Sequence, residues 1–172
     1  MYQIFPERFN NSKTELNPET VVPWGSISKR LEFQGGDLYG VLDKLDYIQK
    51  LGVNILYFNP IFLSNSVHKY DTWDHFEVDP HFGGNEALEK LIKELHKRGM
   101  KIILDCSLNH VHPRNFAFQD LIKNGEKSKY KDWFTVNSYP VRLIYRPHLY
   151  ANTYKVGWDG NQDEYKEYLV KT

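Results

Sequence analysis

The side chains best suited to chemistry follow a short apolar run in the middle of the sequence. Residues 101–104 predict a buried strand covered on both faces, and Asp105, Asn109 and His110 follow it within six positions. In parallel α/β sheets, binding and catalytic groups gather at the carboxyl ends of the strands. Each of these residues alone has an ordinary explanation as a strand end, a turn or a surface histidine. Their coincidence at one strand end favours a functional site.

A second pattern at the same place indicates different chemistry. His110 and His112 occupy alternate positions, which point the same way on an extended chain and could share one metal ion. Further ligands could come from a preceding polar segment: His68, Asp71 and His75. A metal-dependent hydrolase therefore stays open as an alternative, although such a histidine pair usually follows the first strand of a barrel and this strand is the third.

Composition limits the classes of function. The chain of 172 residues has no net charge, so it lacks the positive field that draws proteins to nucleic acid or anionic membranes. No apolar run approaches the length of a transmembrane helix. Cys106 is the single cysteine, which excludes an intrachain disulfide and fits a reducing compartment. We therefore expect a cytoplasmic protein without nucleic-acid or membrane partners.

Apolar periodicity and turn residues predict an alternation of strands and helices. Strands are expected over 2–5, 53–58 and 101–104, and helices over 38–51 and 88–95. Short links connect each helix to the next strand, whereas long polar loops follow the strands. This order predicts an α/β fold, a partial (β/α)8 TIM barrel that comprises about the first three strand-helix units.

The remainder predicts a small inserted subdomain after the third strand. Its residues are aromatic and irregular apart from a short helix expected over 115–124. The predicted division is 1–105 for the barrel strands, 106–160 for the inserted subdomain and 161–172 for the start of the next barrel helix. Because three strands cannot close a barrel, we expect an amino-terminal piece of a larger catalytic domain.

Ordered segments along nearly the whole chain carry a family pattern. The aspartate four residues before Asn-His, within 105–110, is similar to a family's first signature, and Tyr-Lys-Asp-Trp-Phe at 130–134 is similar to its inserted subdomain. The other matching segments are 2–9, 35–38, 51–62, 68–72 and 79–83. Together they resemble the α-amylase family of glycoside hydrolases, most closely its neopullulanase, cyclomaltodextrinase and maltogenic amylase group.

This resemblance implies a reaction and a substrate class. The family cleaves α-1,4 or α-1,6 glucosidic bonds with retention, and this group acts on maltodextrins, cyclodextrins or pullulan. The expected partner is therefore an α-glucan oligosaccharide, and complete relatives are often homodimers. The family's nucleophile and general acid lie beyond residue 172, so we expect no catalytic residue in this chain and no activity from it alone. A non-catalytic sugar-binding protein is the further alternative.

The resemblance also implies roles for particular side chains. Tyr70 would stack on the sugar at the non-reducing side of the cleaved bond, and His110 would hydrogen-bond a hydroxymethyl oxygen of the same sugar. The expected supporting residues, which orient their neighbours or shape the loop, are Asp71, Asp105, Asn109 and His68.

Calcium is the one metal that the resemblance suggests. In this group the loop after the first strand often binds calcium through Asn and Asp side chains, and Asn11 and Asp37 are the candidate ligands here. Lys13 brings a cation to a place where Ca²⁺ would take an oxygen ligand. We therefore expect no bound calcium and no cofactor.

Overall fold

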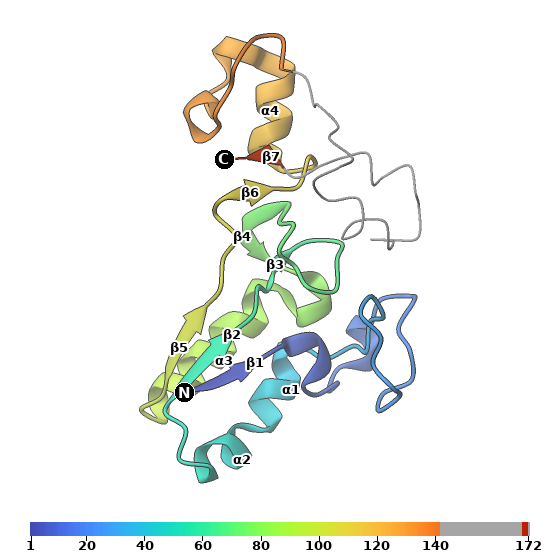
Figure 1. Ribbon diagram of the computed structural model, residues 1–172. Helices are drawn as coiled ribbons and strands as arrows, with labels where there is room; N and C mark the ends of the chain where they lie inside the picture. Colours follow the sequence, from blue (N-terminus) through green and yellow to red (C-terminus); the bar gives the residue numbers. More distant parts are fainter. Residues whose placement is uncertain (142–169, 172) are drawn as a thin grey trace.

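The fold is built on a three-stranded parallel sheet. The computed structural model describes residues 1–141 and 170–171 (Figure 1). The strands are β1 (Tyr2–Ile4), β2 (Ile55–Phe58) and β5 (Lys101–Leu104), in the order β1-β2-β5. Ile4, Phe58 and Leu104 lie side by side in register, so the residues that follow them meet at one edge. This arrangement agrees with the predicted partial barrel.

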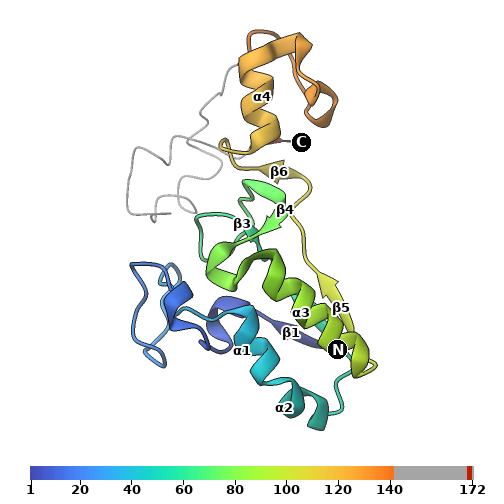
Figure 2. The ribbon, with the colours of Figure 1, turned by 180° about the vertical axis from the view of Figure 1, so that it is seen from behind.

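Helices connect the strands and cover one face of the sheet, as Figure 2 shows from behind. They are α1 (Leu38–Asp43), α2 (Leu45–Lys50) and α3 (Gly84–Lys97). The single helix predicted over 38–51 is in fact two, because the backbone leaves helical geometry at Lys44, where φ is −102° and ψ is 6°. Asp37 caps α1, since its carboxylate accepts a 2.6 Å hydrogen bond from the Gly40 amide.

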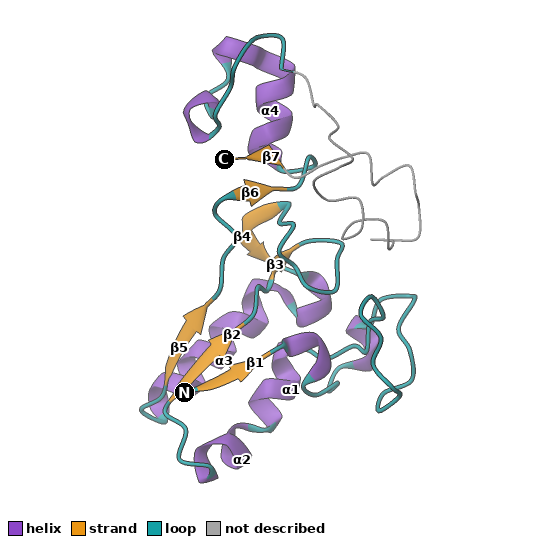
Figure 3. Cartoon of the chain, viewed as in Figure 1, coloured by secondary structure: helices purple, strands orange, loops and turns teal. Residues whose placement is uncertain are grey.

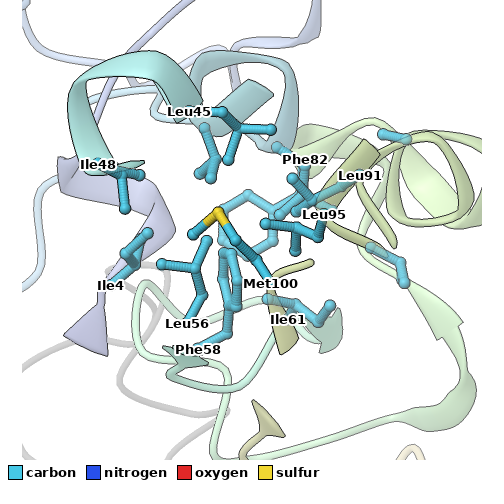
Figure 4. Packing of buried hydrophobic residues seen from close by; sticks show 14 residues of the cluster. Ile4, Leu45, Ile48, Leu56, Phe58, Ile61, Phe82, Leu91, Leu95 and Met100 are labelled. Carbon is cyan, nitrogen blue, oxygen red and sulfur yellow. The ribbon is translucent and has the colours of Figure 1, made fainter. Parts of the chain in front are cut away.

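The main core lies between these helices and the sheet (Figure 4). Leu56 and Phe58 of β2 point into it and are fully buried, and Met100, just before β5, fills its centre. The helices contribute the facing side chains: Leu38, Val41, Leu45, Ile48, Ala87, Leu91 and Leu95. The apolar face of each helix was readable from its spacing, and its burial fixes the helices against the strands.

The other face of the sheet differs from the prediction. β5 was expected to be covered on both faces, but Lys101 and Ile103 are exposed, Ile103 to 42%. The physical reason is that the described helices pack against one face, so alternate side chains of β5 meet no covering layer. β5 is also an edge strand among the described residues, with β2 as its partner.

An antiparallel pair stands where the sequence predicted only a polar loop. β3 (Phe62–Leu63) pairs with β4 (Asp74–Val78), and Figure 3 shows the pair beyond the end of β2. β4 was missed because Phe76 and Glu77 are exposed, so its alternation of apolar and polar residues is incomplete. The pair brackets residues 64–73, and this loop carries several of the predicted site residues.

The last part of the described chain has a second, smaller core. α4 (Phe116–Asn124) confirms the helix expected near 115–124, and Asn115 caps it by accepting from the amides of Ala117 and Phe118. The side chains buried here are Val111, Ala117, Phe118, Leu121 and Phe134. Ile122 and Trp133, by contrast, are about half exposed. The boundaries 1–105, 106–160 and 161–172 stay predictions.

Short elements complete the description. β6 (His110–Val111) pairs with β7 (Val170–Lys171), so Val170 and Lys171 lie in a strand and not in the predicted helix. The rest of the predicted segment, 161–169 and 172, falls outside the described residues. The 3-10 turns are η1 (Pro6–Arg8), η2 (Thr14–Leu16), η3 (Pro80–Phe82), η4 (Gly125–Lys127) and η5 (Lys131–Trp133). None of the described helices has the length and apolar content needed to cross a lipid bilayer.

Candidate functional site

The candidate site begins at the carboxyl edge of the sheet. Asn59 follows β2 and Asp105 follows β5, and the Asp105 amide donates to the Phe58 carbonyl over 2.9 Å, which keeps the two strand ends together. Tyr70 links the two: its phenolic oxygen donates to Asp105 Oδ2 over 2.6 Å and accepts from Asn59 Nδ2 over 3.2 Å. The loop between β3 and β4 is thereby fastened to the edge where parallel sheets build sites.

The Tyr70 ring is therefore fixed at its polar end while it stays only partly buried. Burial and the hydrogen bond to Asp105 raise the pKa of Tyr70 to about 12, so the phenol is protonated and donates. Burial, together with a hydrogen bond to the same carboxylate, also raises the pKa of Tyr57. Asp105 thus accepts the Tyr70 hydroxyl and orients the ring that is predicted to stack on the sugar.

Asp71 is a buried residue of this loop and is held by two serines. Ser64 Oγ donates to Asp71 Oδ1 over 2.6 Å, and the Ser66 hydroxyl donates to the same oxygen. His68 lies beside this group, with Nδ1 3.9 Å from Asp71 Oδ1, and it accepts the Tyr70 amide over 3.1 Å. Burial lowers the pKa of His68, against the attraction of the Asp71 charge, so the ring is neutral near pH 7.

Lys69, which lies between His68 and Tyr70 in the sequence, is buried in an ion pair. Its ammonium donates to Asp79 Oδ2 over 2.6 Å and to the Ser64 carbonyl over 2.8 Å. The rings of Phe33 and Phe82 flank it, with centroids 5.6 and 5.3 Å from the nitrogen. The residue has φ of 60°, the one positive value outside glycine in the described chain.

A buried carboxyl lies in the same region. Glu7 Oε1 accepts hydrogen bonds of 2.6 Å from the amides of Gln34 and Gly35, whereas Oε2 has no partner among the described residues. Burial raises the pKa of Glu7 to about 7, and the negative charge of Asp79 adds to this, while the two amides and the charge of Lys69 act against it. Glu7 is thus close to half protonated near neutral pH.

His110 forms the opposite side of the site. Its Nδ1 donates to Asn109 Oδ1 over 2.7 Å, and Ser107 Oγ lies 3.2 Å from Nε2. Burial lowers the pKa of His110, while a hydrogen bond with the Tyr70 backbone and the charge of Asp71 oppose that shift. The imidazole therefore lies beside Tyr70, and the two residues predicted to bind one sugar are neighbours. Asn109 itself is exposed.

The geometry weighs against a metal centre at the histidine pair. His112 is buried against the Trp73 ring, with centroids 5.5 Å apart, and its Nδ1 accepts the Arg114 amide over 2.9 Å. His75 Nε2 contacts the Ser107 carbonyl at 2.9 Å. Within residues 1–141, no group of three or more His, Cys, Asp or Glu side chains is placed to hold a metal ion.

The loop with the calcium candidates offers few free oxygens. Asp37 is occupied by backbone amides: Oδ2 accepts from Ser12 and Lys13 over 2.9 and 2.8 Å, in addition to its cap on α1. The Asn11 and Asn17 amide oxygens are buried and accept no hydrogen bond from any described residue. The Lys13 ammonium lies 5.7 Å from the Tyr39 ring centroid. Ca²⁺ takes six to eight oxygen ligands, and backbone carbonyls and water can be among them. The side chains alone do not decide the site, and the expected absence of calcium stays a prediction.

Several residues of this site were not predicted from the sequence. Asn59 follows β2 as directly as Asp105 follows β5, so the rule that selected Asp105 also points to it. The serines and the Lys69–Asp79 pair left no such signal, because their roles depend on the turn between β3 and β4. The predicted residues Tyr70, His110, Asp105 and Asp71 do gather at one place, but their roles toward a sugar stay predictions.

Comparison with known proteins gives the context of this site. The model of the α-amylase catalytic domain matches residues 3–172. A cyclomaltodextrinase of Thermoanaerobacter pseudethanolicus is 50% identical over 147 residues, which are 86% of this chain and 26% of the relative. An intracellular maltogenic amylase of Bacillus subtilis is 52% identical over 141 residues, 81% of this chain and 24% of the relative. The chain thus spans about a quarter of the length of these curated relatives.

Solved structures agree with this match. The ligand-free cyclic α-maltosyl-(1→6)-maltose hydrolase from Arthrobacter globiformis superposes with a TM-score of 0.74 at 45% sequence identity, covering 83% of this chain and 32% of that one. The same hydrolase in complex with maltose gives a TM-score of 0.73. The described fold is therefore similar to part of that enzyme.

Proposed function

The chain belongs to the α-amylase family, and from that premise we propose that it supplies one side of the sugar site of a retaining α-glucan hydrolase. In this proposal Tyr70 stacks on the sugar at the cleaved bond and His110 binds a hydroxyl of the same sugar. The observation that carries it is that Asp105 anchors the Tyr70 phenol at the carboxyl edge of the sheet, while His110 reaches the backbone of the same tyrosine.

In this proposal the described carboxylates, Asp71 and Asp105, hold neighbouring side chains in place and do not react themselves. Asp105 Oδ2 accepts from Tyr70, and Asp71 Oδ1 accepts from two serine hydroxyls. A general acid or a nucleophile needs an oxygen directed at the glycosidic bond. One oxygen of each carboxylate already positions a neighbour. We propose that the reacting carboxylates follow later strands of the complete barrel, and that Asp71 and Asp105 keep the sugar-binding side chains in place.

The substrate class follows from the relatives. Proteins of similar sequence are named cyclomaltodextrinase, maltogenic amylase and neopullulanase, and the A. globiformis enzyme acts on cyclic α-maltosyl-(1→6)-maltose. We propose maltodextrins, cyclodextrins or pullulan as the substrates of the complete protein. A homodimeric state and a cytoplasmic location remain part of the same proposal; one relative is named an intracellular enzyme.

A hybrid enzyme tests the proposal. The chain replaces the matching segment of the T. pseudethanolicus cyclomaltodextrinase, which shares half of its residues there and supplies the rest of the catalytic domain. We expect this hybrid to release reducing sugar from cyclodextrin, and the 172-residue chain alone to give only the blank rate. A folded hybrid without activity would overturn the proposed sugar site. Turnover by the purified chain alone would show that its own carboxylates catalyse.

The two alternatives give different outcomes. A metal-dependent hydrolase would retain a stoichiometric transition metal after purification, which elemental analysis detects, and would lose activity with a chelator. A non-catalytic sugar-binding protein would bind maltooligosaccharides in calorimetry as the isolated chain, and its hybrid would bind without turnover. The first outcome would replace the proposed function, and the second would restrict it to binding.

A further inference from the structure

Lys69 combines two features that are unusual in one residue. Its φ of 60° lies in the left-handed region, which a residue with a side chain enters at an energetic cost. Its side chain is 1% exposed although it carries a charge. Strained backbone and buried charge persist only where the surroundings hold them in place, and such strain clusters at ligand sites.

Every polar group of Lys69 is hydrogen-bonded to a neighbouring residue. Its amide donates to Ser66 Oγ over 3.0 Å, and its carbonyl accepts from Thr72 Oγ1 over 3.3 Å. The ammonium joins the two ends of the β3–β4 pair, because Ser64 follows β3 and Asp79 follows β4. Asp79 Oδ2 also accepts the Ser64 amide over 3.3 Å, which closes the network.

The backbone turn at Lys69 separates the rings of His68 and Tyr70. His68 precedes it and Tyr70 follows it, and the turn lets His68 Nδ1 accept the Tyr70 amide over 3.1 Å. The two rings lie with centroids 6.0 Å apart. A change in this turn would therefore move the Tyr70 ring relative to Asp105 and His110.

We propose that Lys69, through its buried pair with Asp79, is a positioning residue that sets the Tyr70 ring against the substrate. A buried ion pair adds little net stability compared with apolar packing, so its best-attested use is to select one geometry. Here the geometry selected is the left-handed turn beside the proposed sugar platform. The inference rests on the proposed function for its kinetic consequence, but the placement of Tyr70 can be measured without turnover.

A double-mutant cycle in the hybrid enzyme tests it. Lys69→Met keeps the length of the side chain and removes the ammonium. We expect kcat to fall about a hundredfold with KM nearly unchanged, since displacement of a site group by about 1 Å has that effect. In a Tyr70→Ala background the same substitution should change kcat by about twofold or less, because its effect passes through the missing ring.

The control is an ion pair of equal length on the surface. Lys90 Nζ lies 2.6 Å from Glu86 Oε1, yet both side chains are more than half exposed and lie on α3, away from the loop. Lys90→Met should leave kcat and KM unchanged. Circular dichroism establishes that each variant is folded at the assay temperature. If Lys69→Met does not fold, Lys69→Met with Asp79→Asn removes both buried charges and takes its place in the cycle.

A spectroscopic measurement separates this inference from the proposed function. In hybrids labelled with ζ-¹³C tyrosine, the Tyr70 signal is assigned by its loss in Tyr70→Phe. Lys69→Met should shift that signal toward the value of exposed tyrosines, and Lys90→Met should not. An inactive hybrid that shows this shift would refute the proposed function and keep the positioning role. An unshifted signal, or an equal loss of kcat with and without the Tyr70 ring, would overturn the role of Lys69.

Discussion

Residues 61–79 and residues 105–112 both bring side chains to the candidate site, but they are held in different ways. The 61–79 segment is tied by buried polar contacts, among them the Lys69–Asp79 pair and the two serines on Asp71. In the 105–112 segment Leu108 is 73% exposed and Asn109 is exposed. The His110 imidazole contacts its sequence neighbours Asn109 and Ser107, and its backbone pairs with the short strand β7. One side of the site is therefore ordered in advance by its own chain, and the other much less so.

This difference shows how a short segment can hold its side chains in one position. A buried hydrogen bond or ion pair is short and directional. Its loss leaves a buried charge or dipole with neither a protein partner nor water, so the segment has few alternative positions. An exposed loop exchanges its contacts with solvent at little cost. Preorganised groups contribute most to a reaction, and we therefore expect the 61–79 segment to dominate both stability and rate.

The largest expected effect comes from breaking the buried pair. Asp79→Ala leaves the Lys69 ammonium buried without its partner, which typically costs about 3 to 5 kcal/mol. Hydrogen exchange of the hybrid, read by mass spectrometry, should show that loss as faster exchange throughout 61–79. Glu86→Ala, which breaks the exposed pair on α3, should leave exchange unchanged. Equal effects of the two substitutions would show that burial of the Lys69–Asp79 pair is not what orders the 61–79 segment.

The next effect concerns pH and the buried carboxyl of Glu7. The pKa of Glu7 is about 7 in the fold against 4.5 for an ordinary glutamate, so below pH 4.5 the carboxyl is protonated in both states and carries no penalty. As pH rises through this window the unfolded chain ionises first, and stability falls until about pH 7, by about 3 kcal/mol in all.

Glu7→Gln should remove this loss, because the amide keeps an oxygen for the Gln34 and Gly35 amides and does not ionise. Exchange rates of 34–35 in the hybrid, measured at pH 5 and pH 8 and corrected for intrinsic exchange, provide the comparison. Glu77→Gln, at an exposed glutamate, is the matched control. A pH dependence that is the same in Glu7→Gln and in the parent hybrid would contradict the buried charge as its cause.

Whether a feature could be predicted from the sequence depends on how far apart its interacting residues lie along the chain. The apolar faces of α1, α2 and α3 and the strand ends at Asn59 and Asp105 follow from local periodicity, so the parallel sheet was predictable. The β3–β4 pair was not, because its short strands are fixed by partners across the loop and not by their own pattern. Lys69 reads as an ordinary surface lysine in sequence, and only the turn that brings Ser64 and Asp79 together reveals its burial.

Removal of the stacking ring should produce a kinetic effect as large as that of Lys69→Met. In the hybrid, Tyr70→Ala should lower kcat about a hundredfold, or about 2.7 kcal/mol, with KM nearly unchanged. A ring fixed by Asp105 and Asn59 gives more to a flattened transition state than to a relaxed sugar. Tyr70→Phe keeps the ring and loses the anchor, so its rate should lie between those of Ala and the parent. A rise in KM with unchanged kcat would instead indicate uniform binding.

The smallest effect is expected on the loosely held side and decides whether the contrast matters for catalysis. His110 is neutral near pH 7, because burial lowers its pKa; its Nδ1 proton is donated to Asn109, so its Nε2 can accept one hydrogen bond from a sugar hydroxyl. Since Asn109, which accepts the Nδ1 proton, is itself exposed, this contact orders the imidazole only weakly, and much of the energy of a bond to the sugar is lost to ordering the segment. His110→Ala should therefore lower kcat only about tenfold, or about 1.4 kcal/mol, on the same maltooligosaccharide. If His110→Ala costs as much as Tyr70→Ala, the 105–112 segment is as preorganised as 61–79 once substrate is bound, and burial within this chain is then a poor guide to which side of the site carries the reaction.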